Sequence, residues 1–225
     1  MLEREREQVA AASRRLAAAG LLIGTAGNVS ARAGEAVAIS PTGAVLADLA
    51  AEQVTVVDLE GRVVAGDLEP SSELALHLGV YRGHGAGAVV HTHAPMATAL
   101  SCVLDELPCI HYQMLLLGGT VRVAPYATFG TPELAQSVVS ALEGRTAALM
   151  ANHGAIAHAA DADHAVELSL LLEWACAVYW RASAIGTPRL LDANQREAVI
   201  AAAVERSYGT TKPVSQSRGQ HEEDR

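Results

Sequence analysis

The chain of 225 residues lacks the features of a secreted or membrane protein. Its three cysteines are odd in number and include no Cys-x-x-Cys pair, which indicates reduced thiols and excludes a disulfide framework. No charge-free apolar run of about 18 residues occurs, and the N-terminal segment is charged and lacks the apolar stretch of a signal peptide. These absences predict a cytoplasmic protein with no membrane partner.

Basic residues are also few, with 16 Lys and Arg against 25 Asp and Glu, a net charge of −9 and a pI of about 5.4. This balance argues against nucleic acid as a partner, so any anionic ligand has to be bound by local donors. No Pro/Gly/Ser-rich linker divides the chain, which predicts a single domain over residues 1–209. The tail at 210–225 has almost no apolar residues and is expected to be disordered.

Helical and strand patterns alternate along the chain. Helices are predicted at 3–19, 73–82, 95–103, 131–144 and from 161 or 163 to about 184, and strands at 36–40, 87–93 and 146–154, with a hairpin over 54–66. Ser71 or Ser72 is expected to cap the helix at 73–82. The mixture of strands and helices predicts a layered α/β domain.

Two histidines at the end of a predicted strand give the strongest chemical signal. Alternate side chains of a strand point the same way, so His91 and His93 present two imidazoles to one point. His153 follows another strand in the same way, and Glu73 supplies an earlier carboxylate. Each histidine alone is more typical of a half-buried core residue, but the combination favours a metal site. Imidazole suits zinc, and three protein ligands with an open position are typical of a catalytic zinc ion.

The remaining histidines carry weaker signals. His77 lies four residues after Glu73, and we expect it on the helix surface or behind the metal ligands. No partner pattern accompanies His84, His158, His164 or His221. These four are assigned no function.

Three stretches of small residues are candidates for an anion site: GTAGN at 24–28, SPTG at 40–43 and PSS at 70–72. Glycine lets backbone N–H groups approach an anion, Ser and Thr add hydroxyl donors, and a helix N-terminus favours negative charge. Each stretch alone is typical of an ordinary turn. The position of 70–72 next to Glu73 favours an anion site beside the metal.

Eight motifs in order carry a resemblance to a known family: GTAGNVSAR, ISPTG, EPSSELALH, VVHTHAP, IHYQM, APYATFGTPEL, ANHGAIA and a late SYG. Over about residues 5–209 the chain resembles the class II aldolase/adducin family, most of all its members that cleave L-fuculose 1-phosphate. The resemblance implies a three-layer α/β/α domain around a central mixed, largely antiparallel sheet. It also implies a zinc-dependent C4 homotetramer, with active sites between subunits, that cleaves a ketose 1-phosphate into dihydroxyacetone phosphate and a small aldehyde such as L-lactaldehyde.

The resemblance further implies roles for residues in the matching motifs. His91, His93 and His153 would hold the zinc ion, and Glu73 would be its fourth ligand at rest and move off to act as a base. The phosphate would be bound by Thr25, Gly27, Asn28, Thr42, Gly43, Ser71 and Ser72. Tyr112 of the adjacent subunit would protonate the aldehyde oxygen, while Phe129 would line the aldehyde pocket and Tyr208 would close the site.

One departure from the family pattern leaves the aldehyde open. Glu205 stands where the family has an aromatic residue, so the wall around the aldehyde end is expected to be more polar or more open. Pentulose-5-phosphate 4-epimerases and methylthioribulose-1-phosphate dehydratases of the same family are the alternative functions. His111-Tyr112 stands where the epimerases have an Asp-Tyr pair, which favours a lyase. The three histidines disfavour a non-enzymatic, adducin-like scaffold.

Overall fold

The computed structural model describes residues 1–211, which fall into two units that divide between Leu191 and Asp192. From residue 212 onward, the tail that we expected to be disordered lies outside the described residues. Among the described helices, none has the length and apolar character needed to cross a membrane.

The first unit is built on a nine-stranded sheet, counted over residues 1–211, in the order β4-β3-β2-β1-β5-β9-β8-β7-β6. All neighbouring strands are antiparallel except β7 and β8, so the predicted mixed, largely antiparallel sheet is confirmed. The strands are β1 (Asn28–Ala33), β2 (Ala36–Ile39), β3 (Thr55–Asp58), β4 (Val63–Ala65), β5 (Ala88–Thr92), β6 (Glu106–Leu107), β7 (Val121–Ala124), β8 (Ala147–Met150) and β9 (Gly154–Ala159).

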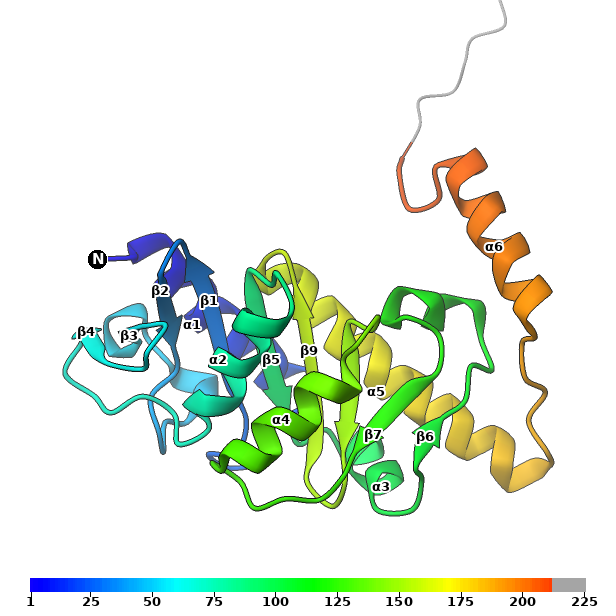
Figure 1. Ribbon diagram of the computed structural model, residues 1–225, viewed down its shortest axis with the longest axis horizontal. Helices are drawn as coiled ribbons and strands as arrows, with labels where there is room; N and C mark the ends of the chain where they lie inside the picture. The colour runs from blue at the N-terminus through cyan, green and yellow to red at the C-terminus, as the bar shows by residue number, and fades with distance from the viewer. Residues whose placement is uncertain (212–225) are drawn as a thin grey trace, which may run out of the picture. The chain divides into compact units, whose positions relative to one another are not determined.

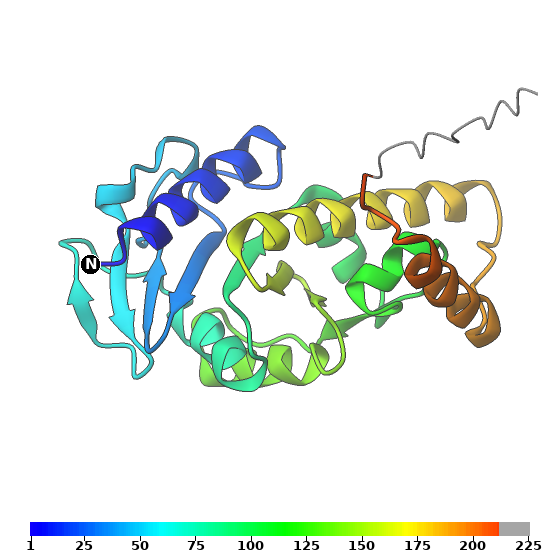
Figure 2. The same cartoon turned by 90° about the horizontal axis from the view of Figure 1, so that it is seen from above.

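Helices cover both faces of this sheet, as Figure 1 and the view from above in Figure 2 show. One layer contains α1 (Glu3–Ala18), α3 (Pro95–Ser101) and α5 (Ala162–Ile185), and the other contains α2 (Leu74–Gly83) and α4 (Pro132–Ala141). Three short 3-10 helices complete the unit, at Leu46–Asp48, Ala51–Gln53 and Tyr112–Leu117. The predicted three-layer α/β/α architecture is therefore confirmed.

The central strands contribute side chains to two hydrophobic cores, one on each face of the sheet. In β5, Val90 packs into the core under α1, α3 and α5, while the next residue back, Val89, packs into the core under α2 and α4. Val56 and Val57 of β3 divide between the two cores in the same way. Because alternate side chains point to opposite faces, a strand covered on both sides is apolar at nearly every position.

Most predicted elements are present, and five additional helices and strands are not among those predicted from the sequence: β1, β6, β7, β9 and α6. The second unit consists of α6 (Ala193–Arg206) and the residues after it. Asp192 caps α6 in a capping box with Gln195, a signal that the sequence does contain.

The expected serine cap of α2 is wrong. Glu73 occupies the N-cap position, and the α2 terminus has no side-chain cap. Instead, the Ser71 hydroxyl accepts a hydrogen bond of 3.2 Å from the Glu73 N–H, one residue before the helix begins. This bond fixes the turn that carries Glu73.

The close approach of β9 to β5 at Gly154 can be tested by substitution. A Cβ atom at this position would lie 2.3 Å from the carbonyl oxygen of Thr92, which is backbone and cannot move aside cheaply. We expect Gly154→Ala to lower the free energy of unfolding by about 1–3 kcal/mol, the usual penalty of overpacking. Urea unfolding would measure it, with Gly186→Ala as control because a Cβ there meets no atom within 4 Å. Equal stability of the two variants would contradict this prediction.

Candidate metal centre and anion pocket

Two of the predicted metal ligands come from the end of β5. His91 lies within the strand and is fully buried, and His93 follows one residue after the strand ends. β5 lies between β1 and β9, so His91 pairs with Asn28 on one side and with Ile156 on the other. A central strand with neighbours on both sides is a rigid support for ligands.

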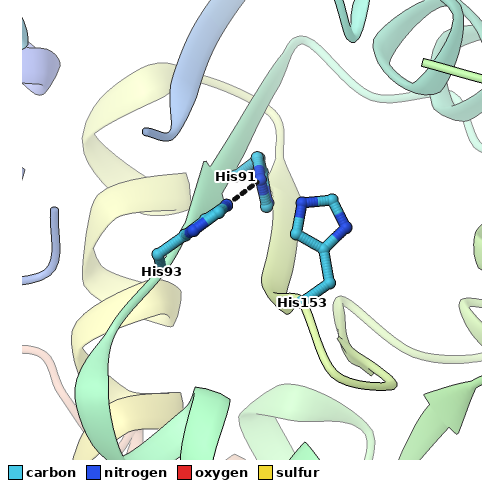
Figure 3. Close-up of side chains that lie close together, drawn as sticks. All are labelled: His91, His93 and His153. Carbon is cyan, nitrogen blue, oxygen red and sulfur yellow. Dashed lines mark hydrogen bonds between the residues drawn. The ribbon is translucent and has the colours of Figure 1, made fainter. Parts of the chain in front are cut away.

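The third ligand comes from the tight turn between β8 and β9. Asn152 has a φ of 55°, the left-handed conformation that Asn adopts more readily than most residues, and the His153 N–H bonds to the Met150 carbonyl at 3.1 Å. This turn directs the His153 ring toward the rings of His91 and His93 (Figure 3). The three ring centroids lie 4.9–5.0 Å apart, and each pair of rings is steeply inclined.

Hydrogen bonding orients the first of these rings. Nδ1 of His91 lies 2.9 Å from the Ala155 carbonyl oxygen, which only accepts, so Nδ1 carries the proton. Nε2 then presents its lone pair, 3.0 Å from Nε2 of His93. One potential ligand atom from each of the three histidines lies within 4.8 Å of the others. Burial lowers the pKa of His93 to about 4 and also lowers that of His153, which keeps both rings neutral and able to bind a metal.

Glu73, the fourth predicted ligand, lies beside the three histidines. Its carboxylate is 6% exposed, with Oε2 at 3.1 Å from His91 Nε2 and Oε1 at 3.4 Å from His153 Nε2. Burial alone would raise its pKa, but the close contact with His91, the hydrogen bond from Asn28 and the proximity of His153 hold that pKa well below the usual range. The carboxylate is therefore ionised.

One oxygen of the buried Glu73 carboxylate lacks a hydrogen-bond donor among the described residues. Oε1 of Glu73 is buried and accepts no hydrogen bond from the residues that the structure describes. A buried acceptor of this kind normally has a partner, and a cation among three neutral imidazoles would provide one. The donor set of three nitrogens and a carboxylate therefore fits a divalent metal such as zinc, and the residues agree with the predicted ligands.

Three of these four side chains border a cavity of about 460 Å³. The residues proposed for phosphate binding all line it: Thr25, Gly27, Asn28, Thr42, Gly43, Ser71 and Ser72. Phe129 lines it as well, and so do Glu73, His93 and His153. The three small-residue stretches and the ligand cluster thus share one pocket, as the sequence predicts.

Backbone contacts hold two of the small-residue stretches together. The Ser71 N–H bonds to the Ser40 carbonyl at 3.1 Å, the Thr42 N–H bonds to the Glu69 carbonyl at 3.0 Å, and Pro41 pairs with Pro70 in an isolated bridge. At the third stretch, Gly27 has a φ of 92°, and a Cβ there would lie 3.0 Å from the His91 carbonyl oxygen. A residue without a side chain is required at that approach.

Some expected residues are placed differently. Asn28 lines the pocket, but its carboxamide bonds to Glu73 and to His77, so these side chains are its partners in the structure and its phosphate role stays a prediction. Tyr112 and Tyr208 are not among the residues that line the cavity. Tyr208 and Glu205 belong to the second unit, so their proposed contacts with the aldehyde also stay predictions.

Two polar residues of the pocket were not singled out from the sequence. Tyr126 and Asn152 both line the cavity. Asn152 directly precedes a predicted ligand in an Asn-His-Gly sequence, and such a residue is a candidate for the left-handed conformation. Tyr126 lies in the APYATFG motif, where only Phe129 had been given a role.

Comparison with known proteins agrees with the site. The family model described as the class II aldolase and adducin N-terminal domain matches residues 7–180. The chain belongs to this family. Its relatives in this family are named as aldolases, which are lyases. We conclude that the chain is a lyase of the class II aldolase family.

Three relatives show how far the likeness extends. The 5-methylthioribulose-1-phosphate/5-deoxyribulose-1-phosphate aldolase of Rhodospirillum rubrum is 40% identical over 191 residues, which cover 84% of this chain and 86% of that protein. The 5-deoxy-D-ribulose 1-phosphate aldolase of Bacillus thuringiensis is 38% identical, covering 88% and 94%. A solved structure of an L-fuculose 1-phosphate aldolase has a TM-score of 0.85 and 34% identity, covering 88% and 95%.

The ligand set can be tested one histidine at a time. We expect His91→Ala, His93→Ala and His153→Ala each to lose bound zinc, because two imidazoles and a carboxylate hold the ion poorly. Metal content measured after dialysis against a weak chelator would show this. His84→Ala is the matched control, because its ring contacts the Val139 carbonyl and lies outside the cluster. Full zinc occupancy in the three variants would rule the site out.

Proposed function

We propose that the protein is a zinc-dependent aldolase that reversibly cleaves a ketose 1-phosphate, similar to L-fuculose 1-phosphate, into dihydroxyacetone phosphate and a small aldehyde such as L-lactaldehyde. One observation carries the proposal: Glu73, His93 and His153 line the same cavity as the small-residue stretches, and His91 completes the histidine cluster behind them. A metal site beside an anion site matches a substrate with a phosphate at one end and adjacent oxygens next to it.

The roles of the residues follow from what the reaction needs. The three histidines would hold a zinc ion, which would supply a Lewis acid for the negative charge that bond cleavage leaves on the dihydroxyacetone phosphate half. Glu73 is the proposed base that exchanges a proton with the carbon of that half, and its ionised state suits proton abstraction. The backbone N–H groups and hydroxyls of the small-residue stretches hold the phosphate and so fix the reacting carbon near Glu73.

A proton donor for the aldehyde oxygen is proposed to come from a second copy of the chain. Tyr112 is 40% exposed and does not line the cavity of its own chain. Its ring lies against His111, with centroids 4.5 Å apart, and His111 packs edge-on against Trp174 at 4.9 Å. An exposed, sterically supported phenol suits a contribution across an interface, which supports the proposed homotetramer. Cytoplasmic location remains part of the same proposal.

A second candidate substrate differs only in the aldehyde half. The two relatives described above with 40% and 38% identity carry the names of aldolases for 5-deoxyribulose 1-phosphate, and one also for 5-methylthioribulose 1-phosphate. Tyr126 and Phe129 give one side of the cavity an apolar character, which suits a methyl or methylthio end. Either substrate would release dihydroxyacetone phosphate.

A substrate screen tests the proposed reaction. Purified zinc-loaded protein would be given L-fuculose 1-phosphate, L-rhamnulose 1-phosphate, 5-deoxyribulose 1-phosphate, 5-methylthioribulose 1-phosphate and L-ribulose 5-phosphate, and release of dihydroxyacetone phosphate would be followed with a coupled assay. We expect release from at least one 1-phosphate. Epimerisation of the 5-phosphate, or loss of water from the methylthio sugar without carbon–carbon cleavage, would instead identify the chain as an epimerase or a dehydratase.

The base can be removed without removing the histidines. We expect Glu73→Gln to retain zinc on three imidazoles and to lower kcat for cleavage by about 10²-fold or more, as loss of a general base does. Stopped-flow kinetics and metal analysis on the same sample separate the two effects. A variant that keeps zinc and cleaves at the wild-type rate would assign the base to another residue.

The anion pocket predicts a dependence on phosphate. Ser72 is exposed to the cavity, and we expect Ser72→Ala to weaken substrate binding by about 1–3 kcal/mol, the loss of a hydrogen bond to a charged group. Inorganic phosphate should compete with substrate in the wild type and less well in the variant. Ser140→Ala, an exposed serine on α4 outside the cavity, is the control. Equal KM values for the wild type, Ser72→Ala and Ser140→Ala would contradict phosphate binding in this pocket.

A further inference from the structure

A line of buried polar groups runs from the metal centre into the core beneath α2. Asn28 Nδ2 donates to Glu73 Oε2 at 2.9 Å, and Asn28 Oδ1 lies 2.5 Å from Nε2 of His77. Nδ1 of His77 lies 2.7 Å from the Ser30 hydroxyl, which is also 2.7 Å from the Tyr81 hydroxyl. All five side chains are buried, and His77 and Ser30 are fully so. The proposed function gives a catalytic role to Glu73 but none to His77, Ser30 or Tyr81.

The donors and acceptors allow one consistent direction. A carboxylate only accepts, so the Asn28 amide must turn its nitrogen toward Glu73 and its oxygen toward His77. His77 then donates from Nε2 and accepts at Nδ1 from Ser30, whose oxygen accepts from Tyr81. The opposite amide orientation would bring the Asn28 oxygen against the ionised Glu73. The line is thus fully satisfied in one arrangement only, and such an arrangement fixes side chains.

We infer that His77 is a positioning residue of the active site: it pins the Asn28 carboxamide, which in turn holds one oxygen of Glu73 and leaves the other facing the histidine cluster. The inference rests on the proposed function in taking Glu73 as the base. A phenylalanine or leucine would fill the same core space. A buried imidazole with both nitrogens bonded is instead suited to orienting the polar group next to it.

Kinetics test whether His77 acts through Asn28. We expect His77→Phe to lower kcat for cleavage by about 10-fold to 100-fold, the usual effect of losing a partner behind a metal ligand, with KM changed less than about twofold. His77→Gln offers an amide N–H to Asn28 and an oxygen to Ser30, and it should restore part of the loss. In an Asn28→Ala background, His77→Phe should cause almost no further loss of kcat, because the connection is already broken.

The absorption spectrum of the Co²⁺-substituted protein tests the same inference without turnover. Bands of Co²⁺ respond to the number and kind of its ligands. We expect the spectrum of His77→Phe to shift toward that of Glu73→Gln, whereas His84→Phe, a control with a half-buried ring outside the line, should match the wild type. If the wild type cleaves no ketose phosphate but His77→Phe still shows this spectral shift, the proposed function is refuted and the positioning role remains supported.

Two results would overturn the inference. One is an additive loss, in which His77→Phe lowers kcat as strongly in the Asn28→Ala background as in the wild type. The other is an unchanged Co²⁺ spectrum in a His77→Phe protein that unfolds at the wild-type temperature. Should His77→Phe fail to fold, Ser30→Ala serves in its place, because loss of that hydroxyl removes the donor that fixes the His77 tautomer. It should give a smaller loss of kcat that also disappears in the Asn28→Ala background.

Discussion

The negative charge of a buried carboxylate must be compensated by neighbouring groups, and at Glu73 several separate segments of the chain contribute to this compensation. His91 and His153 approach the two oxygens, Asn28 donates to one of them, and the turn before α2 fixes the backbone through Ser71. Each partner comes from a different part of the chain. The strand order around β5, the tight turn after β8 and the start of α2 are therefore all needed for one carboxylate to be stable.

The same constraint links stability to chemistry. Oε1 is buried and accepts no hydrogen bond from residues 1–211, so the cluster is an incomplete set of interactions that a divalent cation would complete. The pocket next to it is lined by small residues whose backbones approach closely because glycine permits it. Charge on the protein as a whole is negative, so the affinity for a phosphorylated substrate has to come from this pocket.

The histidine cluster, most residues that line the cavity and the three-layer fold could be predicted from the sequence, because each is carried by local motifs. A strand ending in His-x-His fixes the direction of two rings, and the glycine and serine stretches mark turns. β1 and β9 were harder, because alanine, serine and glycine at positions buried on both faces give neither alternation nor a β-propensity signal. The partnership of Asn28 with Glu73 and His77 joins the start of β1 to α2 and its N-cap, 45 and 49 positions further along the chain, which no local pattern encodes.

Exchange of a carbon-bound hydrogen of dihydroxyacetone phosphate with solvent tests the central claim most directly, because it needs only the metal, Glu73 and the phosphate pocket. Zinc-loaded protein would be incubated with dihydroxyacetone phosphate alone in D₂O and followed by proton NMR. The account predicts loss of one hydrogen at the hydroxymethyl carbon, dependent on zinc and inhibited by inorganic phosphate. An unchanged spectrum with the zinc-loaded protein, under conditions where dihydroxyacetone phosphate binds, would contradict it.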